Sequence, residues 1–152
     1  MPGLVVDAGP LYALADRDDA FHERCLDLLG SFPGPLIVPT LVIRGRRDPQ
    51  GRGPVITEVA YLIGARLGAR AEVLFAQDLA EGAFVVDPVH PADWVRIAEL
   101  VAAYRDFPLG IADASVIASA ERHGVLELAT LDRRHFAAVR PHHGTAFTLL
   151  PA

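Results

Sequence analysis

LGIADASVIASAERHGVLELATLDRRHF, residues 109–136, is the stretch that decides the fold of this chain. A helix is expected over Ile111–His123, because the apolar run follows a break rich in proline and glycine and is closed by a glycine. The short apolar run Leu126–Thr130 then reads as a strand. Asp113 stands in the first turn of the helix, and Asp132 comes just after the strand. The stretch therefore predicts a helix–strand unit of an α/β fold, with one acid opening the helix and another following the strand.

The remainder of the chain alternates strands and helices in the same manner. Further strands are expected at residues 4–6, 35–39, 83–86 and 147–150, and further helices at residues 11–16, 20–29, 58–67, 71–81, 90–104 and 133–138. Gly30 is expected to cap the second helix. The long helix 90–104 is expected to turn inward the side chains of Trp94, Ile97, Ala98 and Val101. The alternation predicts a single domain over residues 1–152, a three-layer α/β/α sandwich with a mainly parallel central sheet.

Composition excludes several classes of protein. With 152 residues, of which 51% are hydrophobic, the chain suits one globular domain and not a disordered segment. No apolar run approaches the roughly 20 residues of a membrane span, and the N-terminus lacks a basic flank of the secretory kind, so we expect no membrane association and a cytoplasmic location. The single cysteine, Cys25, is expected to pack on an apolar helical face and not to act as a nucleophile.

The net charge of −5 argues at first against a nucleic-acid partner. All 14 basic residues are arginine, however, and the planar guanidinium suits phosphate, although the base composition of the gene would explain the same usage. Setting aside four candidate acids, 19 less 4 leaves 15 acids against 14 arginines, a net charge of about −1. Much of the acidity can therefore belong to one site that takes cations.

Four acids stand at the ends of predicted elements: Asp7, Glu58, Asp113 and Asp132. Asp7 and Asp132 follow strands, whereas Glu58 and Asp113 open helices. Since ligands bind outside the carboxyl ends of parallel strands, the four carboxylates can converge there. Clustered carboxylates repel one another unless protons or cations neutralise them, and Mg²⁺ or Mn²⁺ is the natural cation for oxygen ligands. Each acid alone also has a simpler role open to it, as a partner of the helix dipole, a turn residue or an N-cap.

Residues 44–56 interrupt the apolar pattern. Within them, Arg44–Pro54, RGRRDPQGRGP, is the clearest loop in the sequence and is long for a loop. The residues leave three interpretations open: a solvated surface insertion, a loop that contacts RNA, and a segment that binds a partner.

Four segments in order, VVDAGPLYALAD, TEVAYLI, GIADASVIA and ATLDRRHF, resemble the PIN domain, and in particular the VapC toxins of bacterial toxin–antitoxin pairs. The resemblance spans nearly the whole chain. It implies a Rossmann-like α/β/α sandwich and an endoribonuclease that depends on Mg²⁺ or Mn²⁺. It also implies a homodimer and a small VapB-like antitoxin that packs on the apolar helices and blocks the site.

Carried onto this sequence, the resemblance implies a catalytic and metal-binding quartet of Asp7, Glu58, Asp113 and Asp132, with Asp7 and Asp113 foremost as direct ligands. Thr130 matches a hydroxyl position that supports the site. The hypothesis is hydrolysis of an RNA phosphodiester by metal-activated water, with Glu58 ligating or orienting that water. Single-stranded loops are the expected targets. Arg133 and Arg134, beside the site, either bind the phosphate backbone or are surface arginines.

The sequence departs from the family pattern in two places. Ala8, Gly9 and Pro10 stand where many members carry Ser or Thr soon after the first acid, and residues 44–56 read as an insertion just before the Glu58 helix. If that insertion disturbs the helix start, Glu58 is the acid most at risk of being misplaced. A PIN module that binds RNA or a partner without cleavage is therefore the main alternative. A phosphatase with Asp7 as nucleophile would want an acid at position 9, and the six histidines show no ligand spacing.

Overall fold

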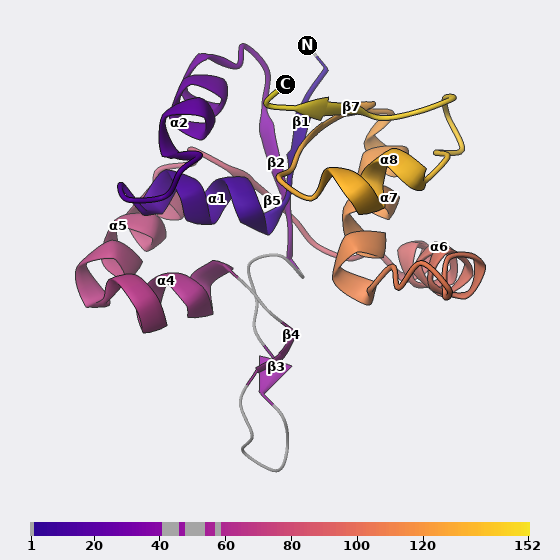
Figure 1. Ribbon diagram of the computed structural model, residues 1–152, viewed down its shortest axis with the longest axis horizontal. Helices are drawn as coiled ribbons and strands as arrows, with labels where there is room; N and C mark the ends of the chain where they lie inside the picture. The colour runs from indigo at the N-terminus through magenta and orange to yellow at the C-terminus, as the bar shows by residue number, and fades with distance from the viewer. Residues whose placement is uncertain (1, 41–45, 48–53, 57–58) are drawn as a thin grey trace.

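The computed structural model describes residues 2–40, 46–47, 54–56 and 59–152 (Figure 1). Its helices are α1 (Ala8–Ala15), α2 (His22–Ser31), α4 (Val59–Leu67), α5 (Ala69–Ala80), α6 (Pro91–Ala103), α7 (Ile111–His123) and α8 (Arg133–Ala138). Its strands are β1 (Leu4–Val6), β2 (Leu36–Pro39), β3 (Arg46–Arg47), β4 (Pro54–Ile56), β5 (Val85–Asp87), β6 (Glu127–Ala129) and β7 (Thr148–Leu150). Within these ranges, none of the helices has the length and apolar character needed to cross a lipid bilayer.

The main sheet has five strands in the order β5-β2-β1-β6-β7, and every neighbouring pair is parallel. The chain builds outward from β1 through β2 to β5 and then returns to place β6 on the other side of β1. The strand order therefore reverses between β1 and β6. In open α/β sheets this switch point is where the crevice for a ligand forms.

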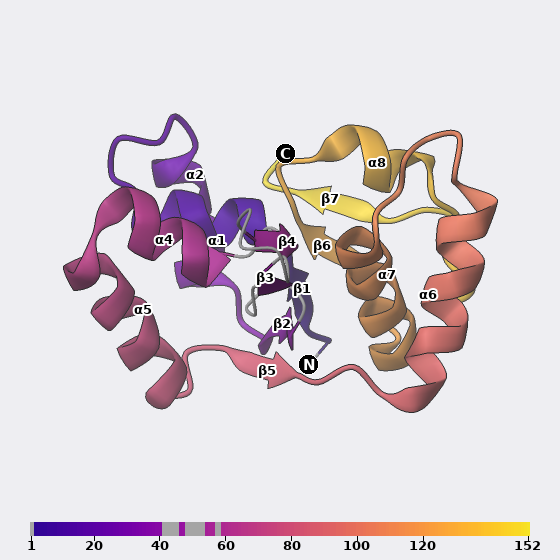
Figure 2. The ribbon, with the colours of Figure 1, turned by 90° about the horizontal axis from the view of Figure 1, so that it is seen from below.

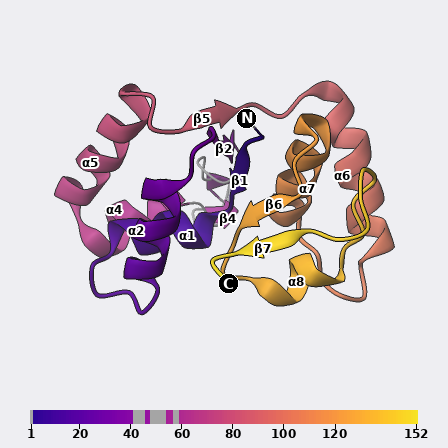
Figure 3. The same ribbon diagram turned by 90° about the horizontal axis from the view of Figure 1, so that it is seen from above.

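Helices cover both faces of this sheet. Figures 2 and 3 show α1, α2, α4 and α5 on one side of the strands and α6 and α7 on the other, while α8 lies along β7. The predicted three-layer α/β/α sandwich with a parallel sheet is confirmed.

The core follows from the sequence of two elements. All three residues of β1 are fully buried, as expected for a central parallel strand with helices on both faces. Helix α7 is buried continuously from Ala114 to Ala120, because its small alanine and serine side chains let it pack against β1, β2 and α6 together. Gly124 ends α7 in the left-handed conformation, with φ of 66°, which favours glycine. Cys25 is buried, as predicted.

Three sequence-based details are wrong. Gly30 does not cap α2, which continues to Ser31. On α6 the buried positions are Asp93, Ile97 and Leu100, whereas Ala98 is exposed and Trp94 is 48% exposed. The inner face of α6 is thus shifted by one residue, because an ion pair with Arg122 allows the charged Asp93 to be buried in place of Trp94.

The segment predicted as a loop over residues 44–56 contains a short β-ladder. β3 and β4 pair antiparallel, with Arg46 opposite Ile56 and Arg47 opposite Pro54, and they form a sheet of their own apart from the main one (Figure 1). The β-branched residues of β4 favour this extended backbone.

Candidate metal centre

The site forms where β1 and β6 end side by side. Asp7 directly follows β1, and its backbone N–H donates to the carbonyl of Ala129 at the end of β6, 2.9 Å away. Thr130 therefore lies next to Asp7. The Thr130 hydroxyl donates to Oδ2 of Asp7 at 3.0 Å and accepts from the backbone N–H of Asp132 at 3.0 Å. Only 1% of Thr130 is exposed, so this hydroxyl joins the two acids from within the protein.

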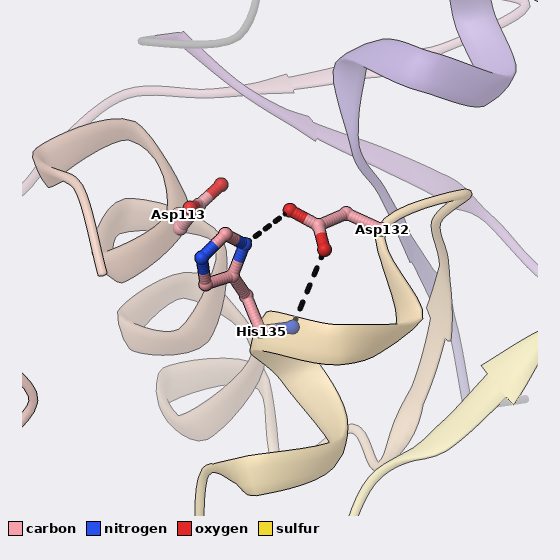
Figure 4. A group of neighbouring side chains, drawn as sticks. All are labelled: Asp113, Asp132 and His135. Atoms are coloured by element: carbon pink, nitrogen blue, oxygen red, sulfur yellow. Dashed lines mark hydrogen bonds and ion pairs between the residues drawn. The ribbon is translucent and has the colours of Figure 1, made fainter. Parts of the chain in front are cut away.

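Helix α7 brings Asp113 to the same place, because α7 packs across β1 and β2 with its first turn at the carboxyl edge. Asp113, Asp132 and His135 each offer one ligand atom, and these three atoms lie within 4.8 Å of one another. Figure 4 shows the three side chains pointing toward one another from α7, the β6–α8 connection and α8. Asp7 is not in this group.

Asp132 has two roles in the structure. As the N-cap of α8, its Oδ1 accepts from the backbone N–H of His135 at 3.3 Å. Its Oδ2 lies 2.5 Å from Nδ1 of the same histidine, within hydrogen-bonding distance. Asp132 therefore fulfils the simpler N-cap role and also faces the other acids, while Asp7, at the N-cap position of α1, makes no side-chain cap there.

Asp7 and Asp113 have raised pKa values, because they are buried near other acids. Burial raises the pKa of Asp7 to about 6, and the charges of Asp113 and Asp132 add to that rise, against a hydrogen bond from the backbone of Ala8 and one from Thr130. The pKa of Asp113 is also raised, first by burial and then by the charge of Asp132. Among the described residues, no arginine forms an ion pair with Asp7 or Asp113. Such carboxylates favour a proton or a cation beside them.

These residues fit a divalent metal ion. Ligand atoms about 2.1 Å from one ion lie at most roughly 4.2 Å apart, so a group within 4.8 Å needs little closure to share an ion. Asp7 is linked to Asp132 through the Thr130 hydroxyl, and the charges of Asp113 and Asp132 both contribute to its raised pKa. Glu58, the fourth predicted acid, lies outside the described residues.

The two arginines after Asp132 are exposed, and each contacts another part of the protein. The guanidinium of Arg133 donates to the carbonyl of Pro151 at 3.0 Å. The guanidinium of Arg134 lies over the ring of Phe107, 5.3 Å from its centroid. The ring of His135 meets the same Phe107 edge-on, with centroids 5.4 Å apart.

The sequence interpretation missed His135, because it looked for spacing among histidines only. The usable signal is the spacing from Asp132, since residues three apart at a helix start lie on the same side. The hydrogen bond to Asp132 raises the pKa of His135, so the imidazolium is favoured as its partner when no metal is bound.

Comparisons with known proteins identify the family and agree with the fold. The PIN domain family matches residues 52–140. Ribonuclease VapC26 of Mycobacterium tuberculosis is 31% identical over 148 residues, which cover 97% of this chain and 100% of that protein. The crystal structure of Mycobacterium tuberculosis VapC20, a Sarcin-Ricin loop cleaving toxin, superposes with a TM-score of 0.71 at 20% identity, covering 93% of this chain and 98% of the other. At that identity, the likeness to VapC20 speaks for the fold alone.

Proposed function

This chain belongs to the PIN-domain family and, within it, to the VapC ribonucleases, and we propose that it is a metal-dependent endoribonuclease that serves as the toxin of a toxin–antitoxin pair. The observation that carries the proposal is the group of acids at the switch point between β1 and β6. Ligand atoms of Asp113 and Asp132 lie within 4.8 Å of each other there, and the charges of both acids contribute to the raised pKa of Asp7.

The cofactor of this proposal is Mg²⁺ or Mn²⁺, held by Asp7, Asp113 and Asp132. A bound divalent cation supplies charge neutralisation at the scissile phosphate and activation of the attacking water. The Thr130 hydroxyl holds the Asp7 carboxylate in one orientation, and the N-cap bond holds that of Asp132. Glu58 is proposed to ligate the cation or orient the water, as the family resemblance implies.

The proposed substrate is RNA, with single-stranded loops favoured because their phosphates and bases are accessible. Arg133 and Arg134 are the basic residues nearest the site in sequence. The contacts of Arg133 with carbonyls near the C-terminus support a structural role for it, whereas Arg134 is exposed and lies over the ring of Phe107, so it is the better candidate for a phosphate contact.

The proposed partners are a VapB-like antitoxin and a second copy of the chain, acting in the cytoplasm. A groove of about 360 Å³ between α1, α2 and α5 supports the first, because its rim includes the exposed side chains of Leu26 and Leu74. An amphipathic antitoxin segment would bury them. The exposed Trp94 and Val95 on α6 offer apolar area for a homodimer.

The test is cleavage of a structured RNA by the purified chain with Mg²⁺ or Mn²⁺, beside the variants Asp7→Asn and Asp113→Asn. We expect cleavage by the native chain, no cleavage in EDTA, and a loss of at least about 100-fold in each variant, because each removes a charged ligand. Asp106→Asn, at an exposed position outside the site, is the matched control and should cleave normally. RNA binding without cleavage would support the non-catalytic PIN module, and equal cleavage in EDTA would refute the proposal.

A further inference from the structure

A small pocket lies next to the metal centre and plays no part in holding the ion. Its volume is about 150 Å³, and its lining comes from the start of α2, from the β6–α8 connection with the first residue of α8, and from the chain after β7: Phe21, Arg24, Thr130, Leu131, Arg133, Pro151 and Ala152. We propose that this pocket binds one base of the RNA substrate, stacked on the ring of Phe21, while the guanidinium of Arg24 pairs with the adjoining phosphate. This inference rests on the proposed function, because it names a subsite for the RNA of that function.

Phe21 presents an aromatic ring at a position where a small polar residue would serve the helix better. It is the N-cap of α2 and makes no side-chain cap, and it is 41% exposed. Its backbone is fixed, because its N–H donates to Oδ1 of Asp19 at 2.8 Å and its carbonyl accepts from the N–H of Cys25 at 2.9 Å. An exposed aromatic ring on a fixed backbone is a platform for base stacking, and every base has a face that can stack on it.

Arg24 supplies the positive charge beside this ring. Residues three apart at a helix start lie on the same side, so Arg24 and Phe21 both face the pocket. Arg24 is exposed and forms no ion pair with another described residue. Its planar guanidinium can therefore pair with a phosphate. The guanidinium of Arg133, in contrast, donates to the carbonyls of Leu149 and Pro151 at 3.5 and 3.0 Å and forms a fixed wall of the pocket.

The pocket and the metal centre share the β6–α8 connection. Thr130 lines the pocket, and its hydroxyl donates to Asp7. Both neighbours of Asp132 also line the pocket, whereas Asp132 itself belongs to the acidic group. The connection lies close against α1, because a Cβ at Gly9 would be only 3.3 Å from that of Leu131. A single strand whose phosphate reaches the acids can therefore place a nearby base in the pocket.

The size of the pocket favours a base over a protein segment. Its volume of about 150 Å³ is less than half that of the 360 Å³ groove between α1, α2 and α5. One planar base fits a pocket of this kind, whereas an amphipathic helix is recognised through a row of apolar anchors along a groove.

The experiment measures the binding of a short, end-labelled oligouridylate by fluorescence anisotropy over a range of KCl concentrations, with Ca²⁺ present to neutralise the acids. Phe21→Leu keeps an apolar side chain without the ring, so affinity should fall at least about fivefold. The slope of log affinity against log salt should stay unchanged in this variant. Arg24→Gln should reduce that slope by about 0.7, the value for one phosphate contact on a single strand.

Two further variants serve as controls. Phe21→Tyr keeps the ring and should bind the oligouridylate as the native chain does. Arg70→Gln, at an exposed arginine at the start of α5 and outside the pocket, should change neither affinity nor slope. Should Phe21→Leu fail to fold, Arg24→Gln still tests the inference at an exposed position.

Photo-crosslinking gives a readout that localises the base. An oligouridylate that carries 5-iodouridine should crosslink to Phe21 of the native chain, as identified by mass spectrometry of the modified peptide. Crosslinks only outside α2, native affinity and slope in both Phe21→Leu and Arg24→Gln, or no binding by the native chain would each overturn the inference.

The outcomes separate this inference from the proposed function. Native binding by both variants of a chain that cuts RNA would refute the subsite alone. A Phe21 crosslink and the expected losses of affinity and slope in a chain that cuts no RNA would support the subsite and count against catalysis alone.

Discussion

Helix α7 places acids near both of its ends, and the two ends differ in how the negative charge is balanced. Near the C-terminal end, Glu121 accepts hydrogen bonds from Nε and Nη2 of Arg96, both at 2.9 Å. One residue on, Arg122 lies 2.6 Å from Asp87 and 3.0 Å from Asp93. Burial alone would raise the pKa of Asp87 and of Glu121, but these arginine contacts outweigh it, and both pKa values are lowered.

Near the N-terminal end the balance is reversed. The pKa of Asp113 is raised, and that of Asp7 beside it rises to about 6, because burial and mutual repulsion are not offset by an arginine. The chain thus pairs the acids near the C-terminal end of α7 with its own arginines, whereas Asp7 and Asp113 have no arginine partner among the described residues. The following predictions test whether that division holds.

Arg122→Met should have the largest effect on stability. It leaves Asp87 and Asp93 buried without their cation, which typically costs roughly 3–5 kcal/mol when one partner of a buried ion pair is removed. Urea unfolding at neutral pH measures the loss. Arg105→Met, at an exposed position, is the control and should stay within about 0.5 kcal/mol of the native chain. A loss no larger than that control's would mean that the network at this end of α7 is not structural.

Asp7→Asn, in contrast, should stabilise the metal-free protein. The rise of the Asp7 pKa from 3.8 to about 6 corresponds to up to about 3 kcal/mol of instability at pH 7, at 1.36 kcal/mol per pKa unit. Asparagine removes the charge and can still accept from Thr130. We expect a higher midpoint of thermal unfolding without metal and a smaller gain from added Mn²⁺ than in the native chain. Destabilisation by this variant would contradict the picture of an uncompensated acid.

The pH dependence of stability should change direction. Since the folded-state pKa of Asp7 is raised, the metal-free protein should gain stability as pH falls from 7 through about 6 toward 3.8. The raised pKa of His135 acts in the same sense, because its contribution is complete below 6.5 and is lost above its folded-state pKa. Asp87 and Glu121 act oppositely, because their contributions are lost only below about 3.8 and 4.5.

Unfolding midpoints from pH 8 to pH 3 should therefore rise and then fall. In Asp7→Asn the rising limb should shrink while the falling limb remains. A native curve that falls steadily from pH 7 downward would contradict this assignment.

Thr130→Val should have the smallest effect of the series. It removes the donor to Asp7 and the acceptor for the backbone N–H of Asp132, at a cost of about 1–2 kcal/mol. RNA cleavage should fall by roughly tenfold, because the hydroxyl supports a metal ligand. Thr130→Ser keeps the hydroxyl and should retain most of the activity, which separates the hydrogen bonds from side-chain volume.

The predictable parts of this molecule are those in which the pattern lies within one element. The apolar run of β1 predicted a strand, and the small apolar residues of α7 predicted a helix. The alternation of strands and helices along the chain then predicted a parallel sheet. The convergence of Asp113 and Asp132 also followed, because both stand at the same sheet edge. The observations that link Asp7 to these acids are its hydrogen bond from Thr130 and the effect of their charges on its pKa. The role of Glu58 stays a prediction.

The parts that failed depend on partners distant in sequence. The buried face of α6 was predicted one residue away from its actual position. Asp93 can be buried only because it pairs with Arg122, which is 29 positions away. His135 was overlooked for a related reason: an imidazole three residues past an N-cap is common, and only the arrival of Asp113 from α7 makes it part of a cluster. A charged or ionisable side chain cannot be assigned until its counter-charge has been placed in space.

The hydrogen bond from Thr130 to Asp7 joins residues 123 positions apart. A chain emerging from the ribosome therefore carries its first acid long before the strand that orients it has been made. An N-terminal fragment that ends before α7, through premature termination or proteolysis, holds Asp7 without Asp113, Thr130 or Asp132. Because such a fragment lacks most of the acids proposed to hold the metal ion, we expect it to cleave no RNA.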